Sequence, residues 1–238
     1  MLQVEDVRAL LENNLQDVRR RIAEAAARSG RSAEAVALVA VTKTVDARLV
    51  RLLWESGVRD IGENRLQEAQ TKAAQLAGCD VRWHMVGHLQ TNKARAAVRL
   101  FSLIHSVDSP RLAQALQKRA AQDGLTVPVL IEVNTSGEAS KFGAPPDAAA
   151  QLAETLDSCQ HLDLRGLMTM APIVERAEEA RPCFRRLREL RDTINESSRL
   201  RRPLSELSMG MTQDFDVAVE EGATMVRIGS ALFRGVLT

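Results

Sequence analysis

The sequence predicts a closed barrel of eight parallel β-strands that alternate with helices, preceded by one additional N-terminal helix. Three observations favour this α/β fold. Short apolar runs recur about eight times in 238 residues, most segments between them have helical periodicity, and no proline- or glycine-rich linker divides the chain. Strands that alternate with helices form parallel sheets, and about eight such units in a chain of this length are typical of a closed barrel. We therefore expect one domain over residues 1–238.

The first expected element is an amphipathic helix over residues 4–29. Val7, Leu11, Val18 and other apolar residues follow at spacings of three and four, and Gly30 ends the pattern. No GxGxxG motif follows any apolar run, which disfavours an open dinucleotide-binding sheet. The expected strands lie near residues 36–42, 58–62, 81–86, 101–107, 127–133, 162–170, 205–209 and 224–228.

Composition excludes several classes of function. A formal net charge of +1 and 3% aromatic residues provide neither a basic face nor stacking platforms for nucleic acid. No run is long enough to span a membrane, and the first residues carry charges where a signal peptide has its apolar core, so we expect a cytoplasmic protein. Cys79, Cys159 and Cys183 lie outside any CxxC spacing and indicate neither disulfides nor zinc. The oligomeric state stays open.

Conspicuous residues follow the predicted strands. In such a barrel the carboxyl ends of the strands meet at one face, where function gathers. Lys43 is the most informative of these residues, because a lysine shielded from water at a strand end can act as an amine nucleophile toward a carbonyl group. The candidates in chain order are Lys43, Glu63, Asn64, His84, Asn134, Ser136, Met168, Ser208, Arg227, Gly229 and Ser230.

Two turns near the C-terminus contain small residues directly after an apolar run. Ser208-Met209-Gly210 and Gly229-Ser230 can expose main-chain N–H groups at a strand-to-helix turn. Convergent N–H groups of this kind bind anions, phosphate above all. The sequence therefore predicts a phosphate site close to Lys43.

The chain resembles the pyridoxal-phosphate homeostasis proteins, whose fold is similar to the N-terminal barrel of alanine racemase. The matching segments run almost end to end: Val39-Ala40-Val41-Thr42-Lys43, Ile61-Gly62-Glu63-Asn64, residues 83–93 (WHMVGHLQTNK), Arg165-Gly166-Leu167-Met168, Leu207-Ser208-Met209-Gly210-Met211 and Val226-Arg227-Ile228-Gly229-Ser230-Ala231. The resemblance implies that Lys43 forms a Schiff base with pyridoxal 5'-phosphate (PLP). It also implies that Ser208, Gly229 and Ser230 hold the phosphate and that Arg227 faces the pyridine nitrogen. The full expected cofactor-binding set is Lys43, Asn64, Met168, Ser208, Met209, Arg227, Gly229 and Ser230.

The resemblance favours a PLP carrier or regulator over a catalyst. An arginine can only donate to the pyridine nitrogen, so the ring is a weaker electron sink than it would be beside a carboxylate. The second base of alanine racemase is a tyrosine from an additional domain, and this sequence contains no tyrosine. We therefore assign no catalytic residue and expect PLP homeostasis, with PLP-dependent apoenzymes as possible recipients.

Two other functions stay open at this point. A racemase-like PLP enzyme would need a proton donor opposite Lys43, for which His84 is the candidate. A Schiff-base aldolase would use Lys43 on a carbonyl substrate and the two turns on its phosphate. A metal site at His84 and His88 is disfavoured, because the segment lacks the glutamate of HExxH. Lys141 lies on an expected long loop at the same face, and we leave it out of the site.

Overall fold

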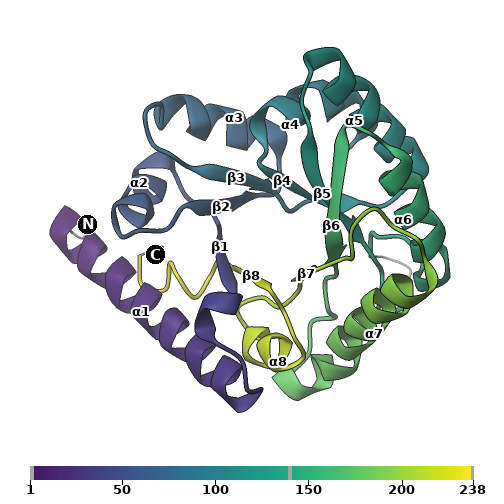
Figure 1. The fold of residues 1–238 in the computed structure, drawn as a ribbon. Coiled ribbons are helices and arrows are strands. Elements are labelled where there is room, and N and C mark those ends of the chain that lie inside the picture. Colours follow the sequence, from purple (N-terminus) through teal and green to yellow (C-terminus); the bar gives the residue numbers. More distant parts are fainter. Residues whose placement is uncertain (1–2, 139–140, 237–238) are drawn as a thin grey trace.

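Eight parallel strands close into a barrel in sequence order, which confirms the predicted fold class (Figure 1). The structure is a computed structural model and describes residues 3–138 and 141–236. The expected domain limits at residues 1–2 and 237–238 lie outside this part. The strands are β1 (Ala37–Val41), β2 (Asp60–Glu63), β3 (Arg82–Met85), β4 (Leu103–Val107), β5 (Val127–Glu132), β6 (Leu162–Met168), β7 (Glu206–Ser208) and β8 (Met225–Ile228).

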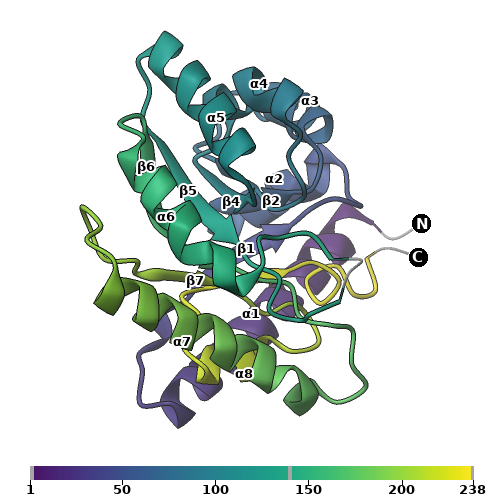
Figure 2. The ribbon, with the colours of Figure 1, turned by 90° about the vertical axis from the view of Figure 1, so that its right-hand side faces the viewer.

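Helices surround the barrel, and the first of them completes the ring (Figures 1 and 2). The chain continues from β8 in turns, and in residues 229–236 the structure has no helix. Helix α1 packs against α2 and α8 instead, so the additional N-terminal helix covers the seam where β8 meets β1. The helices are α1 (Val4–Arg28), α2 (Ala47–Glu55), α3 (Leu66–Gln75), α4 (Ala94–Leu100), α5 (Pro110–Asp123), α6 (Ala149–Ser158), α7 (Arg181–Ser197) and α8 (Phe215–Glu220), with short 3₁₀ helices at Ala33–Ala35, Thr91–Lys93, Pro146–Ala148 and Ala177–Ala180.

Local sequence explains where the helices begin and end. Helix α5 begins after Ser109, whose side chain accepts a hydrogen bond from the N–H of Leu112, and Pro110 occupies the first turn. It ends at Gly124 in the left-handed conformation. Helix α1 buries a stripe of apolar residues at spacings of three and four: Leu11, Leu15, Val18, Ile22, Ala25 and Ala26.

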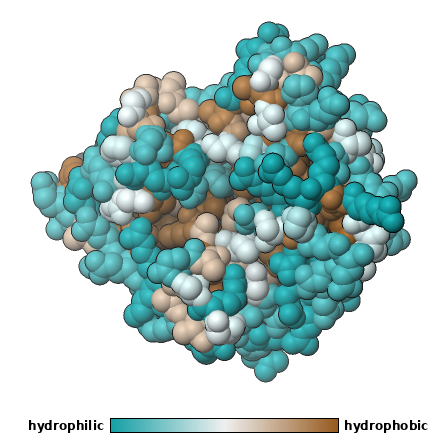
Figure 3. Space-filling view, in the orientation of Figure 1, coloured by the Kyte–Doolittle hydropathy of each residue, from teal (hydrophilic) through white to brown (hydrophobic). Residues whose placement is uncertain are grey.

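The core has two layers, because successive residues of each strand point alternately toward the helices and into the barrel. One set of apolar side chains packs between the strands and the helices. A second, smaller set faces its neighbours inside the barrel: Val39, Val86, Leu103, Leu130, Met168 and Met225. The surface of one face is mostly hydrophilic, with apolar residues gathered in its recessed centre (Figure 3). Because successive strand residues point to opposite sides, each residue at a strand end belongs either to the interior or to the helix layer.

Among the helices of the described segments, none combines the length and the apolar character that crossing a lipid bilayer requires.

Candidate functional site

Lys43 lies at the carboxyl end of β1, in the turn that leads to α2. Strand β1 ends at Val41, two residues earlier, so Lys43 extends beyond the packed part of the barrel. Its side chain is exposed. The expectation that this lysine is shielded from water is therefore wrong for the protein chain itself, because β1 stops before the core would enclose it. The position at the rim agrees with the prediction.

The turn after β8 lies beside the end of β1. The two strands pair with Ala40 opposite Ile228, which places Gly229 next to Val41. A Cβ atom at Gly229 would lie 3.3 Å from the carbonyl oxygen of Val41, closer than most such contacts, so glycine permits this approach. Among the turn and loop hydrogen bonds of the described chain, none has the N–H of Gly229 or Ser230 as its donor. Both N–H groups are thus available near Lys43.

The turn after β7 supplies a hydroxyl that the sequence analysis missed. Thr212 Oγ1 accepts a hydrogen bond from the N–H of Ala231 at 3.3 Å, which joins this turn to the turn after β8. Gly210 enables the turn with a φ of +91°, and a Cβ atom there would lie 2.5 Å from that of Ala218. The sequence feature that could have indicated Thr212 is its hydroxyl side chain two positions after Gly210. Thr212 therefore lies at the edge of the Gly229–Ser230 turn.

Ser208 lies deeper than its expected role at the phosphate requires, and Met209 and Met168 of the expected cofactor-binding set are fully buried as well. Ser208 is fully buried, and its Oγ is hydrogen-bonded to both His105 and Arg227. Met209 packs in the layer between strands and helices, while its N–H donates to the carbonyl of Met225. Met168 belongs to the barrel interior. The structure therefore brings Gly229, but not the Ser208 hydroxyl or the Met209 side chain, next to the end of β1.

Arg227 occupies the barrel interior and is 3% exposed. Its Nη1 donates to Ser208 Oγ at 2.6 Å, and its Nη2 donates to the carbonyl oxygen of Thr169 at 2.8 Å. Burial lowers the pKa of Arg227 to about 10, while the carboxyl groups of Glu132 and Asp214 oppose this shift. The guanidinium therefore remains protonated at neutral pH and is held from two sides.

Glu132 is a second buried group that the sequence analysis did not single out. It ends β5 and is 3% exposed, and its Oε2 has no hydrogen-bond partner within the described residues. Burial, followed by the charge of Asp108, raises the pKa of Glu132 to about 7, and the charge of Arg227 opposes this. The sequence could have indicated it, because Leu130 faces the barrel interior and Glu132, two positions later on the same strand, points to the same side.

A buried ion pair braces the residue that precedes Lys43. Lys72 Nζ of α3 lies 2.5 Å from Glu63 Oε1 and donates to the carbonyl oxygen of Thr42 at 2.6 Å. The Thr42 hydroxyl donates to the same Glu63 oxygen at 2.6 Å. Glu63 thus points toward the helix layer and ties β2 to the end of β1, so it does not line the site.

Replacing Lys72 with methionine is expected to destabilise the protein by about 3–5 kcal/mol, because the fully buried Glu63 carboxylate would lose its counter-charge. Urea denaturation followed by circular dichroism measures this loss. The control is Lys118→Met on the exposed face of α5, which should change stability by less than about 0.5 kcal/mol. Equal losses in the two variants would show that the brace contributes nothing specific.

His84 does not line the open end of the barrel. It is 5% exposed, its Nδ1 lies 2.9 Å from His105 Nε2, and its Nε2 lies 3.0 Å from Asp60 Oδ1. Both ring nitrogens are therefore engaged inside the barrel, which removes the candidate base of a racemase-like reaction. His88 is exposed and stacks on Phe142 with ring centroids 4.3 Å apart. Within the described residues, no group of three or more His, Cys, Asp or Glu side chains could hold a metal ion.

The remaining candidates shape the loops at this end. Asn64 directly follows β2 and is half-buried, and the loop after β3 approaches it closely at Gly87. Asn134 closes the loop after β5, because its Nδ2 donates to the carbonyl oxygen of Glu138 at 2.9 Å. Ser136 donates to Asn134 Oδ1 at 2.8 Å. Lys141 is half-buried on the same loop. Asn134 and Ser136 therefore stabilise the loop.

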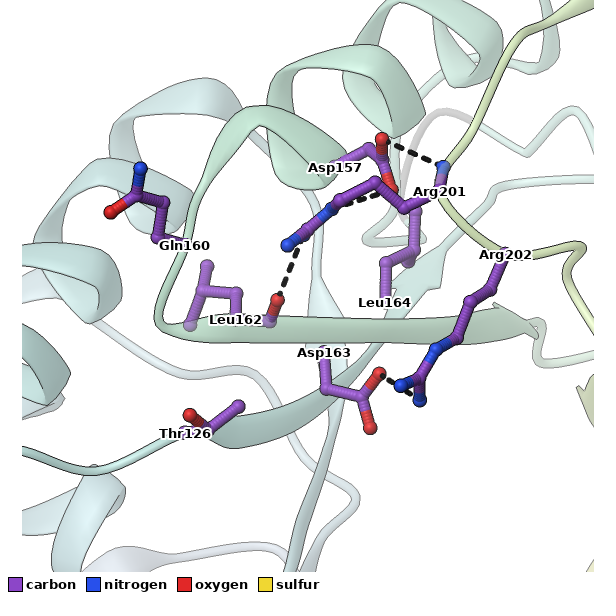
Figure 4. A pocket seen from close by; sticks show the side chains of 8 residues that line it. All are labelled: Thr126, Asp157, Gln160, Leu162, Asp163, Leu164, Arg201 and Arg202. Carbon is purple, nitrogen blue, oxygen red and sulfur yellow. Dashed lines mark hydrogen bonds and ion pairs between the residues drawn. The ribbon is translucent and has the colours of Figure 1, made fainter.

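A separate hollow lies at the opposite end of the barrel, near the starts of β5 and β6 (Figure 4). Its charged side chains already pair with one another: Arg201 Nε lies 3.3 Å from Asp157, and Arg202 Nη1 lies 3.9 Å from Asp163. Thr126 precedes β5 at the same edge. This hollow is distant in the fold from Lys43 and offers no charge that points to a ligand.

Comparison with known proteins agrees with this geometry. The family model of the alanine racemase N-terminal domain matches residues 13–236. The chain is 42% identical to the pyridoxal phosphate homeostasis protein of Aquifex aeolicus over 219 aligned residues. The aligned stretch covers 92% of this chain and 95% of that protein. It is 43% identical over 224 residues to the protein of that name in Pseudomonas aeruginosa, with 94% of each chain covered.

A solved structure extends the comparison to a bound cofactor. PipY of Synechococcus elongatus, solved with PLP bound, is 35% identical to this chain and superimposes with a TM-score of 0.82 over 94% of this chain and 99% of that chain. These matches cover nearly the whole length of this chain and of each matched protein. The chain therefore belongs to the pyridoxal phosphate homeostasis protein family, whose members carry the alanine racemase N-terminal fold.

Proposed function

We propose that this protein binds PLP at the carboxyl end of its barrel, through a Schiff base on Lys43, and serves PLP homeostasis as a carrier or regulator. The observation that carries the proposal is the adjacency of Lys43, at the end of β1, to the Gly229–Ser230 turn at the end of β8, with Arg227 inside the barrel on the same strand. The PLP-bound PipY relative supports the choice of ligand.

The residues at this end fit the phosphate of the cofactor. Gly229 and Ser230 offer main-chain N–H groups, which are suited to a dianion. Thr212 adds a hydroxyl beside them. We assign these three residues to the phosphate in place of Ser208, because both contacts of Ser208 Oγ are made within the barrel.

Arg227 fits the pyridine nitrogen, because a protonated guanidinium can donate a hydrogen bond and cannot accept one. When bound, PLP supplies an aldehyde carbon that an amine can attack reversibly and a ring that can withdraw electrons. A donor at the ring nitrogen leaves that nitrogen unprotonated and limits the withdrawal. Lys43 supplies the amine, and we propose that Asn64, which directly follows β2, and Met168, in the barrel interior, line the space for the ring. We assign Met209 no contact, because its N–H already donates to the carbonyl of Met225. This arrangement holds the cofactor without promoting carbanion chemistry.

The proposed role is therefore binding, not turnover. The family relatives are named for homeostasis of PLP, and the one histidine considered as a second base is engaged with His105 and Asp60. We assign no catalytic residue. PLP-dependent apoenzymes are the recipients that we propose, and the exposure of Lys43 supports this, because an incoming amine can reach the bond to be exchanged.

The test is the absorbance spectrum and intact mass of the purified protein after incubation with PLP, before and after borohydride reduction. We expect a visible band that reduction abolishes and a mass increase of one reduced PLP, mapped to Lys43. Loss of α-deuterium from labelled amino acids should stay at the rate of free PLP. A colourless protein without an adduct would refute the proposal, and catalytic deuterium loss would refute the assignment as a carrier.

A further inference from the structure

A line of side-chain hydrogen bonds crosses the barrel interior. From Arg227 Nη1 it passes to Ser208 Oγ at 2.6 Å, from Ser208 Oγ to His105 Nδ1 at 2.8 Å, from His105 Nε2 to His84 Nδ1 at 2.9 Å and from His84 Nε2 to Asp60 Oδ1 at 3.0 Å. Ser208 and His105 are fully buried, and Arg227 and His84 are at most 5% exposed. Four strands besides β8 thus contribute one side chain each.

The far end of this line is anchored by an ion pair at the opposite end of the barrel from Lys43. Asp60 begins β2 and accepts two hydrogen bonds from Arg82, each of 2.6 Å. Asp60 and Arg82 line a surface hollow together with Arg59. Burial alone would raise the pKa of Asp60, but the hydrogen bonds from Arg82 and His84 outweigh it and hold the pKa well below its usual range. Asp60 is therefore a charged acceptor.

Arg227 at one end and Asp60 at the other determine which atom donates in each hydrogen bond between them. Burial above all lowers the pKa of His105 well below its usual value, so this ring is neutral. Arg227 only donates and Asp60 only accepts. We take His84 as neutral too, and one order then satisfies every contact: the Ser208 hydroxyl donates to His105 Nδ1, His105 Nε2 donates to His84 Nδ1, and His84 Nε2 donates to Asp60.

The reverse order leaves a conflict. If His105 donated from Nδ1 to Ser208, its Nε2 would have to accept from His84 Nδ1. A neutral His84 would then present a bare Nε2 to the Asp60 carboxylate at 3.0 Å, and two acceptors would face each other. Ser208 Oγ would also accept hydrogen bonds from both His105 and Arg227, and its own hydroxyl proton would no longer be donated to His105.

We propose that His84 and His105 are positioning residues, both held as the Nε2–H tautomer, which fix the Ser208 hydroxyl as an acceptor and thereby orient Arg227 toward the pyridine nitrogen of the cofactor. The orientation toward the cofactor rests on the proposed function. The proton order and the hold on Arg227 belong to the protein chain alone.

The tautomers are tested first, by ¹⁵N NMR of the histidine rings in the protein without PLP. His84 and His105 should each show an unprotonated Nδ1 and a protonated Nε2. His161 is an internal reference of the opposite kind, because its Nδ1 lies 2.9 Å from the carbonyl oxygen of Leu125 and must carry the proton to donate. A protonated Nδ1 on His105 would overturn the proposed order.

The hold on Arg227 is tested with His105→Gln and His84→Gln, read out by the guanidinium N–H signals of Arg227. Both variants should shift these signals, although His84 does not touch Arg227. The matched control is Ser106→Ala, next to His105 on β4, because the buried Ser106 Oγ has no hydrogen-bond partner in the described structure. The proposal is refuted if the Arg227 signals do not move in His84→Gln, or if they move equally in the control.

The same variants are then titrated with PLP. His105→Gln should weaken PLP binding roughly tenfold and shift the visible band, as expected when a buried hydrogen-bonding group loses its partner. Unchanged affinity and an unchanged band, beside shifted Arg227 signals, would refute the role toward the cofactor and keep the hold on Arg227. If the wild-type protein binds no PLP, the proposed function fails, while the NMR results still decide the proton order.

Discussion

Replacing Lys43 with alanine is expected to abolish the borohydride-stable PLP adduct and the visible band, while the free energy of unfolding changes by less than about 0.5 kcal/mol. The adduct requires a primary amine beside the phosphate site, and Lys43 is the lysine next to the end of β1. Stability should hardly change, because the side chain is exposed. Intact mass after reduction and urea denaturation measure the two effects.

A second lysine at the same end of the barrel provides the control. Lys141→Ala should retain the adduct and the band, because Lys141 lies on the loop after β5, a strand that neighbours neither β1 nor β8 in the barrel. Lys72 cannot substitute, since its amine is buried against Glu63 and the carbonyl of Thr42. An undiminished adduct in Lys43→Ala would place the Schiff base elsewhere, and peptide mapping would then identify the lysine.

The order and position of the strands could be predicted from the sequence, because apolar runs mark strands such as β1 (Ala37–Val41) and β5 (Val127–Glu132), and helical periodicity fills the segments between strands. The ring of helices was harder to predict. An amphipathic stripe shows that α1 is buried, but not which surface it covers. Only the closure of β8 on β1 creates the seam that α1 fills, and that contact joins segments about 200 residues apart.

The candidate site could be predicted only in part, because a strand end indicates which face of the barrel a residue approaches and not how deep its side chain lies. Ser208 is an interior residue one layer below the rim, while its neighbour Met209 points to the helix layer. A shift of one residue along a strand reverses the side to which the side chain points. Thr212 and Glu132 became visible only when the turns and interior positions were placed in space.

Replacing Glu132 with glutamine is expected to stabilise the protein at alkaline pH and to have little effect at acidic pH. The carboxyl is buried, and its pKa in the folded protein is about 7, above the ordinary value of 4.5. Below the ordinary value both the folded and the unfolded chain hold the proton, so the group favours neither. At pH values between 4.5 and about 7 the folded protein holds this proton and the unfolded chain does not, so the stability of the wild type falls as the pH rises.

The difference of two to three pKa units corresponds to about 3 kcal/mol, which the wild type loses by the time the pH exceeds the folded value. Glutamine has the shape of the neutral carboxyl and cannot ionise, so Glu132→Gln should be more stable by up to about 3 kcal/mol at pH ~8 and nearly equal at pH ~4.5. Arg227 limits the gain, because its charge attracts the ionised carboxylate. The exposed Glu154→Gln is the control in urea denaturation at both pH values. A stability difference that is the same at both pH values would show that Glu132 carries no raised pKa, and that Arg227 with its surroundings accommodates the buried carboxylate without cost.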